Sequence, residues 1–153
     1  MEKLTIRSAN AGDVPRLIEL LEAGALVDGK EDPSNVEAYR AALTEIQESA
    51  ANDILVAELS GEVVGMCQLV VFRHFQRHGG RCAEIESMHV HPTQRSKGIG
   101  EQLLATAMES AREAGCYRVQ LTSNLQRSDA HRFYERMGFD PSHVGFKRLI
   151  EDG

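Results

Sequence analysis

Apolar residues in the first third of the chain follow one strand-like and two helix-like patterns. Leu4-Thr5-Ile6 alternates apolar and polar side chains, as a half-buried strand does. After it, Asn10 and Asp13 offer helix-capping side chains, and Pro15 stands near a helix start. The apolar stripe of this first helix consists of Val14, Leu17, Ile18 and Leu21. The pattern therefore predicts a strand followed by an amphipathic helix.

A loop with glycines separates this helix from a second one. Gly24 and Gly29 interrupt the helical pattern, and the charged pair Lys30-Glu31 follows. Asp32-Pro33 is typical of an N-cap followed by proline in the first helical position. The buried stripe of the second helix is predicted to contain Val36, Tyr39, Leu43 and Ile46. Two helices joined by a flexible loop are suited to form the wall of a substrate pocket.

Three β-rich runs come next. The runs 54–59 and 63–72 are separated by Ser60-Gly61-Glu62, which is a hairpin signal. A further loop, 74–80, leads into the run 82–90. We therefore expect three successive antiparallel strands.

The following segment predicts a βαβ unit. Helical spacing begins at Ile99 and ends at Gly115, and the segment 117–121 is strand-like. Its helical stripe contains Leu103, Leu104, Ala107, Met108, Ala111 and Ala114. A strand, a crossover helix and a second strand lie with the two strands parallel and the connection right-handed.

A short last helix is predicted, with Ser128 or Asp129 as its cap and Gly138 as its stop. Its inward side chains are predicted to be Ala130, Phe133, Tyr134 and Met137. Phe139 and the run 144–150 are then expected to supply the last strand or strands. The resulting order, β-α-α-β-β-β-α-β-α-β, is an α+β fold with an antiparallel half and one parallel pair.

Between the run 82–90 and the long helix lies a glycine-containing turn with two cations. Gly98 and Gly100 lack side chains, so main-chain N–H groups can converge at a helix N-terminus whose dipole favours an anion. Arg95 and Lys97 add positive charge there. The turn lacks the Gly-Lys-Ser/Thr of a P-loop and the third glycine of a dinucleotide-binding turn. It fits another kind of anion site, or an ordinary glycine-rich turn.

Composition narrows the classes of function. The 153 residues carry 17 basic and 23 acidic side chains, a net charge of -6, and no long basic run, so we expect no nucleic-acid partner. The basic cluster from Arg73 to Arg81 is better explained as a solvated turn. Three cysteines without Cys-x-x-Cys spacing indicate neither a disulfide framework nor a zinc site. Because no apolar run reaches membrane-spanning length, we expect one cytoplasmic domain, residues 1–153, without a membrane partner.

Two motifs give the chain a resemblance to a known family. Arg-x-x-Gly-x-Gly at 95–100, after a strand ending in Val-x-Pro, resembles the pyrophosphate loop of GNAT acetyltransferases. Ala-x-x-Phe-Tyr-x-x-x-Gly-Phe at 130–139 looks like the family's Ala-x-x-x-Tyr-x-x-x-Gly-Phe on its last helix. The predicted element order also matches the family from Leu4 to Leu149, so the chain is identified as a member. The resemblance implies a GNAT-like mixed, mostly antiparallel sheet, with flanking helices and with strands four and five parallel and splayed around acetyl-CoA.

The resemblance implies direct transfer of an acetyl group from acetyl-CoA to a primary amine in a ternary complex. Tyr134 is then the expected proton donor to the departing thiolate, because a phenol with a pKa of about 10 stays protonated at neutral pH. Glu84 and Glu86 lie two apart on one strand and share a face, and either is a candidate base. A packing role for Tyr134 and a surface role for either carboxylate are the alternatives.

For the cofactor, the resemblance implies a main-chain N–H at Met88 or Val90 on the thioester carbonyl and the glycine loop on the pyrophosphate. Asn124 is expected either to hydrogen-bond the pantetheine arm or to orient the last helix. Arg127, which replaces a usual asparagine, is expected near the 3′-phosphate. The predicted cofactor-binding set is Met88, His89, Val90, Arg95, Ser96, Lys97, Gly98, Ile99, Gly100, Asn124, Arg127 and Tyr134. We predict no metal site, because the histidines lack ligand spacing.

The acceptor is less well defined by the sequence. Parts of the segment 122–143 resemble aminoalkylphosphonate acetyltransferases, which suggests a small-molecule amine as partner. Two other functions are compatible with the same residues: a non-catalytic module that binds or senses acetyl-CoA, and a peptide or protein N-acetyltransferase. Thiol release in the presence of an amine panel distinguishes an enzyme from a sensor, and an N-acetyltransferase of peptides would need an extended groove. A homodimer is an expectation at the level of the family.

Overall fold

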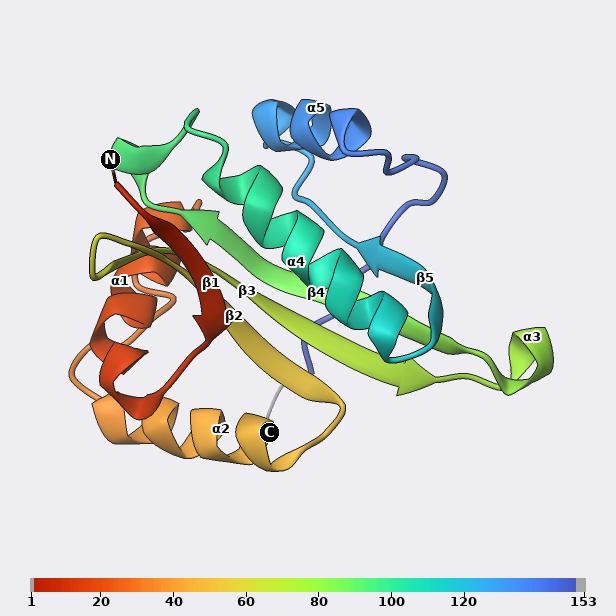
Figure 1. The fold of residues 1–153 in the computed structure, drawn as a ribbon, viewed down its shortest axis with the longest axis horizontal. Helices are drawn as coiled ribbons and strands as arrows, with labels where there is room; N and C mark the ends of the chain where they lie inside the picture. The colour runs from red at the N-terminus through yellow and green to blue at the C-terminus, as the bar shows by residue number, and fades with distance from the viewer. Residues whose placement is uncertain (1, 151–153) are drawn as a thin grey trace. The chain divides into compact units, whose positions relative to one another are not determined.

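Five strands form one sheet in which they lie in sequence order, β1-β2-β3-β4-β5 (Figure 1). The computed structural model describes residues 2–150. The pairs β1/β2, β2/β3 and β3/β4 are antiparallel. β5, which follows the helix α4, runs parallel to β4. The strands are β1 Leu4–Ser8, β2 Asn52–Leu59, β3 Glu62–Arg73, β4 Arg81–Val90 and β5 Cys116–Leu121. The predicted α+β class, with one parallel pair beside an antiparallel half, is confirmed.

The helices fall into two compact units of the chain, Met1–Gln120 and Leu121–Gly153. The first unit holds α1 to α4, and the second holds α5. Their bounds are α1 Val14–Gly24, α2 Val36–Glu48, α3 Gln76–Gly79, α4 Ile99–Glu113 and α5 Ser128–Arg136, with 3₁₀ turns η1 Ala11–Asp13 and η2 Pro92–Gln94. Within residues 2–150, no helix combines the length and apolar character that crossing a membrane requires.

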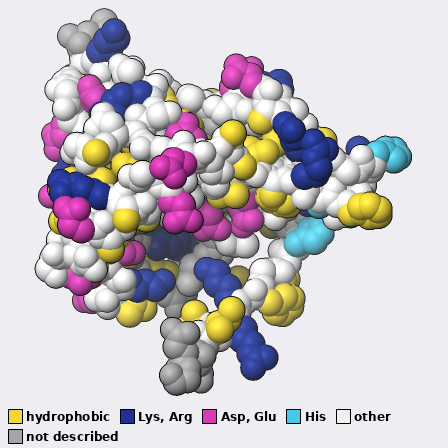
Figure 2. Space-filling model, turned by 90° about the horizontal axis from the view of Figure 1, so that it is seen from below, with side chains coloured by type: hydrophobic (Ala, Val, Ile, Leu, Met, Phe, Trp, Pro, Cys, Tyr) yellow, Lys and Arg dark blue, Asp and Glu magenta, His cyan; other side chains and the backbone are white. Residues whose placement is uncertain are grey.

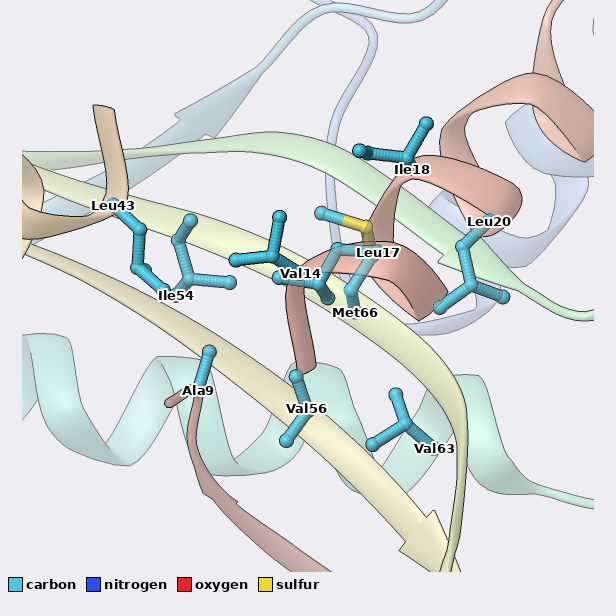
Figure 3. Close-up of a cluster of buried hydrophobic side chains, with 10 residues drawn as sticks. All are labelled: Ala9, Val14, Leu17, Ile18, Leu20, Leu43, Ile54, Val56, Val63 and Met66. Carbon is cyan, nitrogen blue, oxygen red and sulfur yellow. The ribbon is translucent and has the colours of Figure 1, made fainter. Parts of the chain in front are cut away.

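α1 and α2 cover one face of the sheet, and α4 covers the other (Figure 3). On the first face, side chains of both helices pack with β2 and β3 in one apolar cluster (Figure 3). The cluster contains Ala9, Val14, Leu17, Ile18, Leu20, Leu43, Ile54, Val56, Val63 and Met66. On the second face, Leu103, Leu104 and Ala107 of α4 are fully buried. Because both faces are covered, the central strands read as nearly continuous apolar runs.

Local sequence explains how the first helix begins. The Asn10 side-chain oxygen accepts a hydrogen bond from the Gly12 N–H at 3.0 Å, and the Asp13 carboxylate accepts one from the Asn10 N–H at 2.8 Å. This reciprocal pair is a capping box, and it sits at η1 directly before α1. Pro15 lies in the first turn of α1, where its missing N–H has no helical partner to lose.

The hairpin between β2 and β3 also follows from its residues. Ser60 and Gly61 have φ values of 51° and 86°. Positive φ at both central residues is what a two-residue type I′ turn requires, and this turn matches the twist of the strands it joins. Leu59 and Glu62 pair directly across it, as the hairpin prediction implies.

The start of α2 differs from the prediction. The helix begins at Val36 with Asn35 as its N-cap, so Asp32 does not cap it. The Asp32 carboxylate instead accepts hydrogen bonds from the N–H and the hydroxyl of Ser34, which forms a turn ahead of the helix. Asp-Pro suits such a turn as well as a helix start, so the dipeptide alone does not separate the two. Leu43 is the buried residue of α2, while Val36, Tyr39 and Ile46 pack partly buried against the cluster.

The predicted end of the chain needs two corrections. α5 begins at Ser128 with Arg127 as its N-cap, so neither Ser128 nor Asp129 caps it, although Gly138 stops it with φ 93° as predicted. Residues 139–150 form no strand. Alternating apolar residues favour an extended backbone, but a strand also needs a partner for its hydrogen bonds. Among the described residues of this unit only Leu121 belongs to a strand, and the apolar side chains of Val144, Phe146, Leu149 and Ile150 are exposed.

Candidate active site

β4 carries a bulge near its carboxyl end. Its register against β3 shifts by one residue between Glu86 and His89. Within the shift, Ser87 has φ 52°, a left-handed conformation that few residues other than glycine adopt. A bulge bends its strand and takes main-chain groups out of the ladder with the neighbour. The sequence carried no signal for it, because Glu-Ser-Met-His reads as an ordinary strand.

Glu84, Glu86 and His89 lie on one face of the sheet. His89 pairs directly with Met66, which belongs to the apolar cluster beneath α1 and α2. Glu86 pairs directly with Gln68, two residues farther along β3, and directly paired residues share a face. Glu84 is half-buried and Glu86 is exposed. The two carboxylates share a face as their spacing predicts, and the bulge adds His89, which strict alternation would place on the other face.

A 3₁₀ turn, Pro92–Gln94, follows β4. The His91 N–H donates to the Val64 carbonyl at 2.8 Å and fastens the end of β4 to β3. The Thr93 N–H donates to Nδ1 of His91 at 3.2 Å, so this imidazole caps the turn. His91 therefore has a local structural role as the cap of this turn.

The glycine loop ends in the first turn of α4. Gly98 is the N-cap with φ 78°, and no side chain caps this helix end. A Cβ atom at Gly98 would meet nothing within 4 Å, so the space beside the loop is open. The first N–H groups of a helix have no acceptor inside it and form the positive end of its dipole. Ile99 and Gly100 occupy this first turn.

Two exposed cations flank the same turn. Nε of Arg95 donates to the Val90 carbonyl at 3.2 Å, and Nζ of Lys97 donates to the Gln94 side-chain oxygen at 2.9 Å. These bonds hold both side chains beside the loop and leave them in contact with solvent. With the helix N-terminus they form an arrangement suited to a phosphate group.

The segment after α1 lines a cavity of about 220 Å³. At its far end, the Tyr39 hydroxyl donates to the Glu31 carboxylate at 3.1 Å and accepts from the Asp32 N–H at 2.9 Å. The lining residues are Glu22, Ala25, Val27, Asp28, Gly29, Lys30 and Glu31. The end of α1 and the loop after it therefore line a small cavity, while the substrate pocket walled by the two helices stays a prediction.

The basic loop before β4 lies at the opposite end of that strand from the glycine loop. β4 begins at Arg81 and ends at Val90. Two side chains of the basic loop contact Tyr117 of β5. Nε2 of His74 lies 2.7 Å from the Tyr117 hydroxyl, and the Arg77 guanidinium lies 5.0 Å from the Tyr117 ring centroid. Figure 2 shows histidine and hydrophobic side chains gathered at this end. The loop is a solvated turn, as predicted, and its middle forms the short α3, in which Arg77 and His78 have positive φ values of 57° and 58°. It packs on Tyr117 and is separate from the glycine loop.

Asn124, Arg127 and Tyr134 belong to the second unit. The Asn124 side-chain oxygen accepts from the Gln126 N–H at 2.9 Å, and its carbonyl accepts from the Arg127 N–H at 3.0 Å. Asn124 therefore shapes the turn before α5. Tyr134 lies on α5, and its ring centroid is 5.9 Å from that of Phe139 in an edge-on arrangement.

The predicted site residues are divided between the two units: residues 84–100 lie in the first unit, and Asn124, Arg127 and Tyr134 lie in the second. The first unit brings the carboxylates, the bulge and the glycine loop together in one stretch of chain, from Glu84 to Gly100. The roles of Asn124, Arg127 and Tyr134 stay predictions. In the part of the chain that the structure describes, no three His, Cys, Asp or Glu side chains are arranged to hold a metal ion.

Comparison with known proteins identifies the relatives of this chain. Residues 18–139 match the Acetyltransferase (GNAT) family. Aminoalkylphosphonate N-acetyltransferase from Salmonella typhimurium is 44% identical over 91 residues, which are 60% of this chain and 58% of the length of that protein. Glucosamine 6-phosphate N-acetyltransferase from Trypanosoma brucei brucei is 29% identical over 136 residues, 89% of this chain and 88% of that protein.

Solved structures resemble this chain over nearly its whole length, and one of them is described as a putative acetyltransferase from Agrobacterium tumefaciens str. C58, with a TM-score of 0.85 and 26% identity over 95% of this chain and 99% of its own. A protein from Bacillus halodurans C-125, described as a transcriptional regulator, has a TM-score of 0.92 and 37% identity, covering 97% of this chain and 100% of its own. The family match includes the bulged strand, the glycine loop and α5. Members of this family use acetyl-CoA as the acetyl donor. The chain therefore belongs to the GNAT acetyltransferase family.

Proposed function

We propose that this protein transfers the acetyl group of acetyl-CoA to the primary amine of a small molecule, by direct attack within a ternary complex. One observation carries the proposal. In a single unit, two carboxylates on one face, a bulged strand and a glycine-initiated helix N-terminus follow one another between Glu84 and Gly100. These features correspond to the needs of the reaction: a base, a donor for developing negative charge, and an anchor for a phosphate-bearing donor.

The first turn of α4 holds the pyrophosphate of the donor. Main-chain N–H groups there point out of the helix at the positive end of its dipole. The open space beside Gly98 lets an anion approach the main chain. Arg95 and Lys97 add charge at the rim, where solvent screening makes each contribution small. The residues present therefore fit the cofactor.

The bulged part of β4 polarises the thioester. A main-chain N–H at Met88 or Val90 donates to the thioester oxygen and stabilises the negative charge that develops there. The bulge supplies a reason for this location, because it frees β4 from regular pairing with β3 at the residue before His89. Acetyl-CoA supplies the activated acyl group when it is bound.

Proton transfer is assigned to side chains. Glu84 or Glu86 accepts the proton of the ammonium group through a water molecule, and both face the side on which α1 lies. The half-buried Glu84 is the more shielded of the two from bulk water. Tyr134 donates a proton to the departing thiolate, an assignment that rests on the motif at 130–139.

The acceptor is a short amine that carries an anionic group. The similarity to the aminoalkylphosphonate enzyme, 44% identity over 60% of this chain, supports this class. The cavity of about 220 Å³ beside α1 is lined by three carboxylates and one lysine, so it suits the ammonium end of the acceptor and not its anionic end. Arginines of this chain would bind the anionic group, because guanidinium groups bind phosphonates and phosphates in bidentate fashion.

Release of free thiol from acetyl-CoA tests the proposal. The amine panel contains aminoalkylphosphonates, polyamines, amino acids, aminoglycosides and a peptide with a free N-terminus. We expect thiol release above the hydrolysis rate with at least one small amine, and faster turnover of an anionic amine than of an uncharged amine of equal length.

Three outcomes would contradict parts of this proposal. Binding of acetyl-CoA without turnover of any amine would identify a sensing module. Turnover of the peptide alone would identify a peptide N-acetyltransferase. Equal or faster turnover of the uncharged amine would remove the anionic acceptor and leave the acetyl transfer.

A further inference from the structure

The end of α1 meets β4 in an unusually close contact. A Cβ atom at Gly24 would lie 2.1 Å from Nδ1 and 2.5 Å from Cε1 of His89. Real Cβ atoms essentially never come within 3.0 Å of a heavy atom that belongs to a residue distant in the chain. The edge of the imidazole therefore occupies the space that a side chain at position 24 would need. Glycine is required here by packing, because its backbone conformation is an ordinary helical one.

His89 stands between the two halves of the candidate site. Its side chain faces α1, on the same side of the sheet as Glu84 and Glu86. Its main chain directly follows the bulge and directly precedes Val90. A shift of this imidazole would therefore be felt both at the end of α1 and along the strand that carries the candidate carboxylates.

Gly24 is the point from which the cavity-lining segment departs. α1 ends at Gly24, and the backbone becomes extended at Ala25, with ψ 138°. The segment Ala25–Glu31 lines the cavity from there, and Tyr39 fastens its far end through Glu31. Its middle contributes little packing, since Leu26 and Val27 are 49% and 63% exposed. The position of the segment is therefore decided mainly at its two ends.

We propose that His89 is a positioning residue for the acceptor side of the site. Its imidazole edge, packed on the main chain of Gly24, sets where the segment Ala25–Glu31 leaves α1 relative to the carboxylates of β4. The inference rests on the proposed function, in which this segment contacts the amine acceptor. In this inference the side chain of His89 supports the acceptor-binding segment, whereas the sequence analysis included His89 among the residues that bind the cofactor.

Two single variants and their combination test this role. Gly24→Ala forces a methyl group into the space of the imidazole, and His89→Ala removes the support of the segment. Each should raise the KM of the acceptor about tenfold, roughly 1.4 kcal/mol, while the KM of acetyl-CoA stays within about twofold. In the double variant the new methyl group enters the space that the ring has left, so the acceptor KM should return toward the wild-type value.

Gly12→Ala is the matched control. It makes the same substitution just before the same helix, and its Cβ would meet only Asn10 Oδ1, at 3.2 Å. Both KM values should stay unchanged. A purely structural role for His89 would lower the melting temperature and raise both KM values together in the two single variants, which would contradict the inference.

Hydrogen exchange supplies a readout that needs no catalysis. The Ala25 N–H donates to the Glu22 carbonyl at 3.2 Å and the Asp32 N–H to the Tyr39 hydroxyl at 2.9 Å, so these two amides at the ends of the segment should exchange about tenfold faster in each single variant and recover in the double variant. Unchanged exchange in both single variants, or single effects that simply multiply in the double variant, would overturn the inference whatever the activity. If the wild-type protein acetylates no amine, the proposed function fails, and the exchange data still decide the role of His89.

Discussion

His89 and His91 stand two residues apart at the end of β4, and their imidazoles have different surroundings. Nδ1 of His91 accepts the Thr93 N–H and caps a local turn. The ring of His89 packs on Gly24, a residue far away in sequence. The sequence shows the same residue type in both places, so the contacts decide the role of each.

At the residue scale, Tyr134 is the sharpest test of the mechanism. Tyr134→Phe keeps the ring that lies edge-on to Phe139 and deletes only the hydroxyl. General-acid assistance is typically worth roughly 10²–10⁴-fold, so kcat should fall by about that range. The KM of acetyl-CoA should change little, because the interaction exists only in the transition state. Steady-state kinetics under conditions where chemistry limits the rate would measure both.

Tyr117→Phe is the matched control for this variant. It removes the hydroxyl that lies 2.7 Å from His74, at the far end of β4 from the glycine loop, and kcat should stay at the wild-type value. An acyl donor with a more acidic thiol should also reduce the effect of Tyr134→Phe, because a better leaving group needs less help. A wild-type kcat in Tyr134→Phe would return the residue to a packing role.

At the scale of elements, the junction of β4, the glycine loop and α4 should control the affinity for acetyl-CoA. Gly100→Val puts a branched side chain in the first turn of α4, where main-chain N–H groups must approach the pyrophosphate. The KM of acetyl-CoA should rise at least about tenfold in a folded protein, as for the loss of one good hydrogen bond to a charged group. Kinetics and circular dichroism together would check this.

Arg95→Ala makes the comparison within the same loop. Its guanidinium is exposed, and a solvent-screened charge contributes little, so the KM of acetyl-CoA should change less than in Gly100→Val. Arg118→Ala, at the Tyr117 end of the sheet, is the control and should have no effect. If Gly100→Val bound acetyl-CoA as the wild type does, the glycine loop would not belong to the site.

At the scale of the whole molecule, one ion network couples β1 to the start of α1 and to β2. The Arg7 guanidinium donates to both oxygens of the buried Asp13 carboxylate, at 2.8 and 3.0 Å, and to Glu58 at 2.9 Å. The hydrogen bonds from Arg7 lower the pKa of Asp13 below its ordinary value, against the opposing effect of burial, and the Asn10 N–H adds to the lowering. The network joins residues that are up to 51 positions apart in the chain.

Because the pKa of Asp13 is lowered in the folded state, the free energy of unfolding depends on pH in the acid range. Because the folded state holds the ionised form more strongly than the unfolded state does, the stabilisation is fully present above the unfolded pKa, about 4. It is lost as pH falls through the lower folded pKa. Asp13→Asn should therefore reduce the free energy of unfolding at pH 7 by about 1–3 kcal/mol and flatten its dependence on pH below about 4. Urea unfolding at a series of pH values would measure this.

Glu19→Gln is the control for the pH experiment. Its carboxylate pairs with Arg16 and is 60% exposed, so the free energy of unfolding should change by less than about 0.5 kcal/mol. An equally steep pH dependence in Asp13→Asn and in the wild type would show that other carboxylates cause the acid sensitivity.

The sequence by itself determined the elements whose signals are local. The hairpin at Ser60-Gly61, the stop of α4 near Gly115 and the helix start after Asn10 depend on residues within a few positions of one another. The order of the elements then settled the α+β class and the parallel pair, because a helix crossover returns the chain to the edge where the first strand began, so that the second strand runs in the same direction. The glycine loop was predictable because its signal is also local: Gly98 adopts a positive φ, which glycine tolerates.

Only the tertiary structure decided the features that depend on residues far apart in sequence. The bulge of β4 exists as a register against β3, and the need for glycine at position 24 exists only because His89 lies against it. Residues 139–150 have a strand-like pattern but form no strand, since extended backbone becomes a strand only beside a partner. Local patterns report what a segment can adopt, and contacts between distant residues select among these options.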